Sequence, residues 1–332
     1  MALESRSSGQ RPTPGFAIAR ALTIDVTRPG VSAKMRGDVM TYRGLYTALV
    51  TPFRQGKIDE PAYRALIERQ IAAGVDGIVP VGTTGESPTL NHNEHSAAIR
   101  LAIEAAAGRV QVIAGTGSNA TVEAVEMTRE AERMGANGTL QVCPYYNKPS
   151  QEGLYLHFRT IAEATSLPVL LYSIPGRCGI EIAVDTVARL AHDCPNIVAL
   201  KEAGGSVERV NQLVRALPAD FSILSGDDGL TVPFISCGAQ GLVSVTSNLI
   251  PAAMKQLVDA ALSGDGAAAQ TLQKRYYPLM KGLMSLDTNP VPIKAALAMR
   301  GEMEWDIRLP LVPLDEAKRG QLRDLLERFH LL

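Results

Sequence analysis

Short apolar runs alternate with stretches of helical periodicity from residue 45 to residue 245. The apolar runs cover residues 45–50, 78–81, 110–114, 139–142, 169–172, 197–200, 221–224 and 241–245. Each run suits a strand buried on both faces, and the periodic stretch after it suits a helix that returns the chain to the next parallel strand. Eight such units in about 200 residues, without a break in composition, predict an α/β fold of the (β/α)8 TIM-barrel type rather than a doubly wound sheet.

The residues after the eighth run also have a mostly helical pattern. Apolar periodicity continues over residues 251–262, 266–283, 291–299 and 315–329. One barrel does not need this many helices. We therefore expect a barrel over residues 41–250 and a small helical appendage over residues 251–332, packed on the barrel.

Residues 1–40 differ from the rest of the chain. They are rich in proline, serine, glycine and arginine, and their acids are limited to Glu4, Asp25 and Asp38. An arginine-rich start with few acids resembles an organelle transit segment, whereas Met35 and Met40, just before the periodic region, fit an over-long start. We favour a disordered N-terminal extension or such an over-long start, and exclude the segment from the fold.

Composition excludes several classes of protein. The 33 basic and 34 acidic residues nearly balance, so no electrostatic footprint for nucleic acid is expected, and no apolar run reaches the roughly 18 residues of a membrane span. The four cysteines are scattered without a CxxC pair, which favours a reducing, cytoplasmic compartment over zinc or a disulfide framework. His92, Glu94 and His95 do not form the HExxH order of a zinc site, and dinucleotide and P-loop fingerprints are missing, so we expect no metal and no cofactor.

A lysine directly follows the sixth apolar run. Lys201 comes after residues 197–200 and before a glycine pair, so it is predicted to lie at the C-terminal end of a buried strand, where α/β folds place their chemistry. An apolar surrounding disfavours the ammonium form, lowers the pKa and makes the amine nucleophilic. Most lysines at strand ends are instead solvated, so Lys201 alone only suggests a Schiff-base site.

Other reactive side chains follow neighbouring strands and would share the same end of the barrel. They are Thr83, Thr84, Tyr145, Tyr146, Tyr172 and Arg177. Phenols linked through a threonine hydroxyl can relay protons, and a guanidinium can hold a carboxylate. Each residue alone has a structural explanation, such as packing for the tyrosine pair or a surface ion pair for Arg177. Together they indicate a small α-keto acid, activated as an imine and then an enamine that attacks a second carbonyl compound.

Six motifs resemble those of the dihydrodipicolinate synthase family, within the N-acetylneuraminate lyase superfamily. They are GTTGES at 82–87, PYYNKP at 144–149, YSIPGR at 172–177, LKEA at 200–203, SGDD at 225–228 and NPVPIK at 289–294. Their order and spacing match the family from about residue 44 to residue 332. The resemblance implies a lyase that condenses pyruvate with L-aspartate 4-semialdehyde, the first committed step of lysine and diaminopimelate synthesis.

The resemblance also implies roles for individual residues. Lys201 matches the Schiff-base lysine, and Tyr172 matches the tyrosine that passes protons to and from the imine. Thr83 and Tyr146 match the rest of the proton relay, in which the residue at Tyr146 comes from the neighbouring subunit of a homotetramer built as a dimer of dimers.

Three further positions match residues that bind substrate in the family. Thr84 matches the threonine at the carboxylate of pyruvate. Arg177 matches the arginine that receives the carboxylate of the semialdehyde. Gly205 is expected beside the site.

A feedback site for L-lysine is implied at the interface of the tight dimer. The matching residues are Ser87, Pro88, His92, His95, Asn119, Glu123 and Tyr145. Glu123 could pair with the ammonium groups of the effector, while Asn119 and Tyr145 could bind its carboxylate. The combination of His95 and Glu123 favours a lysine-sensitive enzyme.

Three positions differ from the family pattern, and three alternative functions remain open. Ser173 stands where the family commonly has asparagine, Cys178 where it has threonine, and Pro88 where it has alanine. The alternatives are an N-acetylneuraminate lyase, a 2-keto-3-deoxy-sugar-acid aldolase, or a catalytically silent sensor of keto acids or amino acids. The threonine pair, the tyrosine loop and Arg177 favour the synthase, because a short carboxylated aldehyde needs a guanidinium and a sugar does not.

Overall fold

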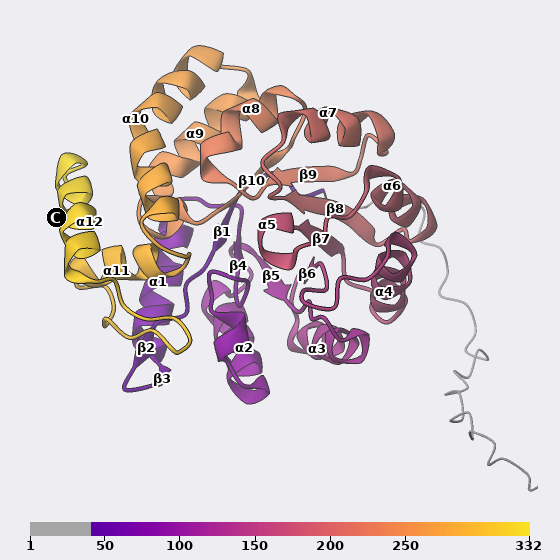
Figure 1. The fold of residues 1–332 in the computed structure, drawn as a ribbon, viewed down its shortest axis with the longest axis horizontal. Coiled ribbons are helices and arrows are strands. Elements are labelled where there is room, and N and C mark those ends of the chain that lie inside the picture. Colours follow the sequence, from indigo (N-terminus) through magenta and orange to yellow (C-terminus); the bar gives the residue numbers. More distant parts are fainter. Residues whose placement is uncertain (1–40) are drawn as a thin grey trace, which may run out of the picture. The chain divides into compact units, whose positions relative to one another are not determined.

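Eight parallel strands close into a barrel in the computed structural model, which describes residues 41–332 (Figure 1). Around the barrel the strands follow the order β1-β10-β9-β8-β7-β6-β5-β4. They are β1 (Gly44–Ala48), β4 (Gly77–Val79), β5 (Gln111–Gly115), β6 (Gly138–Val142), β7 (Val169–Ser173), β8 (Ile197–Glu202), β9 (Ser222–Ser225) and β10 (Gly241–Ser244). This confirms the predicted (β/α)8 barrel, and each of the eight apolar runs of the sequence overlaps one of these strands.

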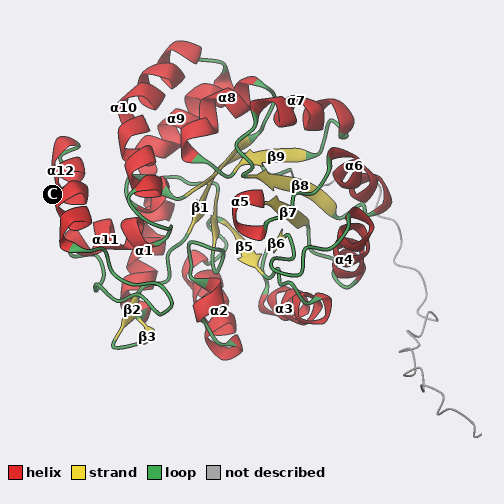
Figure 2. Cartoon of the chain, in the orientation of Figure 1, coloured by secondary structure: helices red, strands yellow, loops and turns green. Residues whose placement is uncertain are grey.

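Helices surround the ring of strands (Figure 2). They are α1 (Glu60–Ala72), α2 (His92–Ala106), α3 (Thr121–Met134), α4 (Gln151–Glu163), α6 (Val184–Asp193), α7 (Val207–Ala216), α8 (Thr231–Ser236) and α9 (Pro251–Ser263). The sequence explains two of the helix starts. The Asp59 carboxylate accepts a hydrogen bond from the Ala62 amide, and Asn91 with Glu94 forms a complete capping box.

The C-terminal residues continue from the barrel without a separate core. Helix α9 packs against β1 and β10, as a barrel helix should, so the expected boundary at residue 250 falls between β10 and its own helix. The appendage then consists of α10 (Gly266–Ser285), α11 (Val291–Met299) and α12 (Glu316–Arg328). Residues 41–332 belong to one compact unit.

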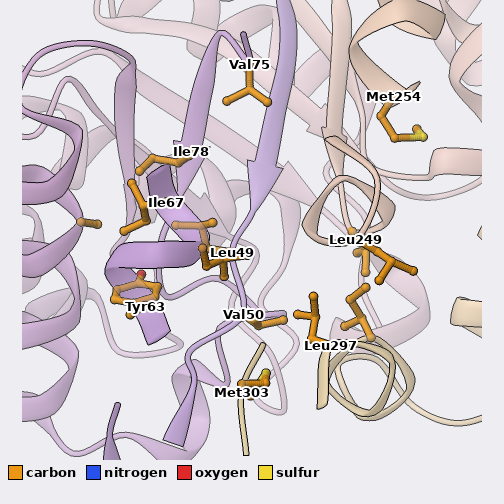
Figure 3. Packing of buried hydrophobic residues seen from close by; sticks show 14 of the residues in the cluster. Leu49, Val50, Tyr63, Ile67, Val75, Ile78, Leu249, Met254, Leu297 and Met303 are labelled. Carbon is orange, nitrogen blue, oxygen red and sulfur yellow. The ribbon is translucent and has the colours of Figure 1, made fainter. Parts of the chain in front are cut away.

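One hydrophobic cluster joins the barrel to the appendage. Leu49 and Val50 after β1 and Tyr63 on α1 belong to the same buried cluster as Leu297 on α11 and Met303 beyond it (Figure 3). Burial of apolar side chains stabilises by about 25 cal/mol per Å². The appendage is therefore part of the main core, and it can hold catalytic loops in place.

Two local elements were not predicted. Strands β2 (Phe53–Arg54) and β3 (Lys57–Ile58) form an antiparallel hairpin whose turn residues, Gln55 and Gly56, have positive φ angles. The expected loop after β7 contains the short helix α5 (Pro175–Cys178). Both elements are too short to produce a readable hydrophobic period.

Two further expectations concern the N-terminal segment and membrane-spanning helices. The prediction of a disordered extension falls on residues 1–40, outside the described residues. Among residues 41–332, the helices are too short or too polar to cross a membrane.

Candidate active site

Lys201 and Tyr172 lie side by side at the C-terminal ends of two adjacent strands. The parallel register pairs Tyr172 on β7 with Lys201 on β8. Both side chains are buried, and the Lys201 Nζ atom lies 4.1 Å from the centroid of the Tyr172 ring. The two residues predicted for imine formation and proton transfer are therefore in contact.

The environment of Lys201 makes its amine reactive. The side chain is only 6% exposed, and this burial lowers the pKa of Lys201 to about 7. The negative charge of the Asp228 carboxylate raises the pKa of Lys201, whereas the positive charge of Arg177 lowers it further. At neutral pH a substantial fraction of Lys201 is therefore the free amine that attacks a carbonyl.

Asp228 is a buried acid that the sequence motif contained without an assigned role. Its carboxylate accepts hydrogen bonds from the amides of Val245 at 3.0 Å and Thr246 at 3.1 Å, and from the hydroxyl of Ser244. Burial raises the pKa of Asp228, and these three bonds oppose that rise. The carboxylate is thereby fixed at the end of β10 and favours the charged form of Lys201.

Tyr172 is held in its neutral form. Burial raises the pKa of its phenol to about 12, although hydrogen bonding to the Thr83 side chain and the charge of Arg177 act in the other direction. A neutral phenol beside the amine can donate a proton and receive it back. The Thr83 side chain therefore lies beside the phenol, where the predicted proton relay requires it.

A cavity of about 240 Å³ opens beside Tyr172, and Lys201 is not among the residues that line it. Its lining includes Thr83, Tyr172 and Arg177, with an apolar wall from Leu140 and Val142. A small volume with an apolar wall and a few convergent polar groups suits small organic acids rather than large ligands.

Two predicted substrate-binding residues are tied together by a third residue. Thr84 is buried, and its Oγ1 atom accepts a hydrogen bond from Asn289 Nδ2 at 3.0 Å. An Arg177 Nη2 group donates to the backbone carbonyl of the same Asn289 at 3.1 Å. Asn289 lies within the NPVPIK motif, which the sequence marked without showing this contact.

Tyr146 is not brought to the cavity within one chain. Its side chain is 92% exposed and its φ angle is 73°. A single chain therefore brings Lys201, Tyr172 and Thr83 together, and Tyr146 stands apart from them.

Gly205 is not among the residues that line the cavity, and its place beside the site stays a prediction. A Cβ atom built on Gly205 would meet nothing within 4 Å. Gly226, after β9, is the glycine beside the nucleophile. A Cβ atom there would lie 2.7 Å from the Ala203 Cβ atom and 3.1 Å from the Lys201 Cε atom. Gly226 reaches Lys201 from the next strand, a contact that proximity in sequence does not indicate.

The residues expected to bind an effector form a cluster at the outer side of this cavity. Ser87, Pro88 and Tyr145 line the cavity itself. His92 Nε2 lies 3.3 Å from Glu123 Oε1.

Further contacts hold this cluster together. The Ser118 hydroxyl donates to Glu123, and Asn119 Nδ2 donates to the carbonyl of Tyr145 at 3.1 Å. His95 lies behind them, where burial lowers its pKa and favours the neutral imidazole.

Two positions that depart from the family pattern are Cys178, which lines the cavity, and Ser173, which follows Tyr172 at the end of β7. Burial raises the pKa of the Cys178 thiol to about 11, so it is neutral at physiological pH and a poor nucleophile. The Ser173 hydroxyl is buried and has no hydrogen-bond partner among residues 41–332. In that part of the chain, no group of three or more histidine, cysteine, aspartate or glutamate residues is arranged to hold a metal ion.

Comparison with known proteins shows which family the chain matches. The Dihydrodipicolinate synthetase family matches residues 41–329. A 4-hydroxy-tetrahydrodipicolinate synthase of Nitratidesulfovibrio vulgaris is 47% identical over 287 residues, which cover 86% of this chain and 98% of the relative.

Solved structures agree with that match. The 4-hydroxy-tetrahydrodipicolinate synthase of Methylacidiphilum fumariolicum superposes with a TM-score of 0.86 at 55% identity, covering 87% of this chain and 96% of the other. A synthase from Cyanidioschyzon merolae, solved with lysine bound, gives a TM-score of 0.85 at 42% identity over 87% of this chain and 99% of the other.

Proposed function

The chain belongs to the dihydrodipicolinate synthetase family, and we propose that it carries out the family reaction with the side chains gathered around Lys201. The reaction is the condensation of pyruvate with L-aspartate 4-semialdehyde to 4-hydroxy-tetrahydrodipicolinate, a lyase reaction of lysine and diaminopimelate synthesis. The observation that carries the residue assignment is a buried lysine with a pKa of about 7, in contact with a neutral tyrosine at the mouth of a small cavity.

Lys201 supplies covalent catalysis in this proposal. Its amine adds to the keto carbon of pyruvate, and loss of one water gives the imine. Loss of a methyl proton then gives an enamine, whose carbon attacks the aldehyde of the semialdehyde and forms the new carbon–carbon bond. The amino group of the second substrate finally displaces Lys201 at the imine carbon, which closes the ring and restores the enzyme.

Tyr172 and Thr83 move the protons of these steps. The phenol lies beside the amine and is hydrogen-bonded to the threonine, so it can protonate the departing hydroxyl and receive a proton back. Tyr146 would complete the relay from a neighbouring subunit of a homotetramer, built as a dimer of dimers. Its 92% exposure in the single chain supports this assignment. Sedimentation velocity tests it, because a purely monomeric active enzyme would contradict it.

The carboxylates of the two substrates are assigned to different residues. Thr84, which is buried, would hold the pyruvate carboxylate, and Arg177, which lines the cavity, would hold that of the semialdehyde. A sugar acceptor would have no use for the guanidinium. The family match likewise does not favour the alternative aldolases or the silent sensor.

The direct test is pyruvate consumption with three acceptors. Rapid consumption is expected with L-aspartate 4-semialdehyde, and much slower consumption with N-acetylmannosamine or glyceraldehyde. A preference for either sugar would leave Lys201 as the nucleophile but would overturn the assigned second substrate.

Arg177→Ala should damage use of the semialdehyde far more than use of pyruvate. Loss of a charged hydrogen bond typically costs about 1.5–3 kcal/mol, which corresponds to about a 10- to 100-fold fall in kcat/KM for the semialdehyde. Pyruvate should still form an imine, which borohydride reduction and mass spectrometry detect. Equal losses for both substrates would contradict the assignment.

We further propose that L-lysine binds the outer cluster as a feedback inhibitor. Glu123 has a carboxylate for an ammonium group, Asn119 and Tyr145 are adjacent, and the solved relative with lysine bound supports the choice of ligand. Because Ser87 and Pro88 line the same cavity as Thr83 and Tyr172, lysine at this position would act close to the catalytic relay.

Glu123→Gln should weaken inhibition by lysine by about tenfold or more, because a charge-assisted hydrogen bond is lost. The measurement is the lysine concentration that halves the rate at pH 8. Glu126→Gln, an exposed change on the same helix, serves as the matched control. Insensitivity of the unmodified enzyme to millimolar lysine would refute the proposal.

A further inference from the structure

Asn289 connects the two residues that are assigned to substrate carboxylates. It lies between α10 and α11, and it is 5% exposed. Its side-chain Nδ2 group donates to Thr84 Oγ1, 205 residues away in sequence, and its backbone carbonyl accepts from Arg177, 112 residues away. One residue of the appendage therefore contacts the loop after β4 and the helix after β7.

The hydrogen bond from Asn289 determines where the proton of Thr84 can go. A threonine hydroxyl has one proton to donate and lone pairs that accept. Because Asn289 Nδ2 donates into Oγ1, the proton of Thr84 remains available for another acceptor. A substrate carboxylate is such an acceptor. If the side chain presented an oxygen instead, it would compete with the substrate for this proton.

We propose that Asn289 is a positioning residue, which directs the Thr84 hydroxyl proton toward the carboxylate of pyruvate and holds Arg177 beside it. The inference rests on the proposed function, which assigns Thr84 and Arg177 to the two substrates. It adds that the appendage sets the separation of the two carboxylate-binding groups, and hence of the two carbons that are joined.

The surroundings of Asn289 support a fixed position. Lys294, on the first turns of α11, forms a buried ion pair with Glu86, which lies two residues after Thr84. The other oxygen of Glu86 accepts from the Arg308 amide at 3.2 Å. The loop that carries Thr84 is therefore held by the appendage at two separate points, and such support restricts the geometry of a binding group.

The Asn289 side chain has a further feature that a structural role alone does not explain. Its Oδ1 atom is buried and has no hydrogen-bond partner among the described residues. A buried acceptor without a partner is unfavourable. A residue that served only to fill space at this position would not need an amide.

Two substitutions separate the donor role from packing. Asn289→Asp keeps the shape but replaces the donor with a charged acceptor, which withdraws the Thr84 proton and repels the substrate carboxylate. Asn289→Ala removes the donor together with the rest of the carboxamide and introduces no charge. The pyruvate concentration for half-maximal imine trapping by borohydride should rise by about tenfold or more in the aspartate variant, and by less in the alanine variant. Because the trapping needs only pyruvate, the result does not depend on the second substrate.

A double-mutant cycle tests whether Asn289 affects pyruvate affinity through the Thr84 hydroxyl, which a purely structural role would not require. Thr84→Val removes the hydroxyl and keeps the shape of the side chain. In that background Asn289→Ala should cause no further loss of pyruvate affinity, whereas in a Thr84→Ser background, which keeps the hydroxyl, it should still cause one. If Asn289→Ala does not fold, Asn289→Ser, whose shorter side chain does not reach Thr84, takes its place in the cycle.

The possible outcomes distinguish this inference from the proposed function. Additive losses in the Thr84→Val background, or unchanged pyruvate affinity in all Asn289 variants of an active enzyme, would overturn the inference and leave the proposed function standing. Absence of any trapped imine in the unmodified protein would instead overturn the proposed function.

Discussion

Lys201→Met removes imine formation with pyruvate completely and lowers the overall rate by more than about 10⁴-fold, as expected when a covalent nucleophile is lost. Methionine has a similar length and no amine, so it fills the same buried space beside Tyr172. Borohydride reduction with pyruvate should add mass to the unmodified protein and none to the variant. The melting temperature should not fall, because burying an amine in an apolar site is itself costly.

The pH dependence of imine formation provides a second check on Lys201. Since burial lowers the pKa of Lys201 to about 7, the fraction of free amine rises between pH 6 and pH 8 and then levels off. The trapping rate at limiting pyruvate should follow the same curve. An exposed lysine would continue to gain reactivity up to about pH 10. A midpoint near 10 would therefore show that the amine is solvated and that its burial does not activate it.

The barrel could be predicted from the sequence because its signals are local. Each strand is a short apolar run, and helix starts such as Asp59 and the Asn91–Glu94 capping box depend on residues three positions apart. The site could be predicted in part for the same reason. Lys201 and Tyr172 each end a strand, and parallel strands place such residues at the same end of a barrel.

The remaining features depend on contacts that no local pattern contains. Gly226 lies against Lys201 from the next strand, a contact that proximity in sequence does not indicate. The bonds of Asn289 to Thr84 and Arg177 join segments more than a hundred residues apart. The motif around Asn289 marked the segment as distinctive, but only the three-dimensional structure shows what it contacts.

Lys294→Met should destabilise the protein more than any other single change to an ion pair described above. Lys294 and Glu86 are both buried, and the Lys294 Nζ atom lies 4.2 Å from the centroid of the Phe53 ring. Removing the lysine leaves the Glu86 carboxylate buried without its cation, which typically costs about 3–5 kcal/mol. Methionine still packs on Phe53, so the loss of stability reflects the missing positive charge rather than a change in packing volume.

Thermal melting at one fixed protein concentration measures this effect, and a fall of roughly 5–10 °C is expected. Arg64→Met is the matched control, because the Arg64–Glu104 pair is exposed and should contribute less than about 1 kcal/mol. Adding Glu86→Gln to Lys294→Met removes the uncompensated charge and keeps an acceptor for the Arg308 amide, so it should recover much of the lost stability. If Lys294→Met is no more harmful than Arg64→Met, the buried pair does not hold the Thr84 loop to the appendage. In that case the hydrophobic cluster around Leu297 and Met303 must provide the attachment instead.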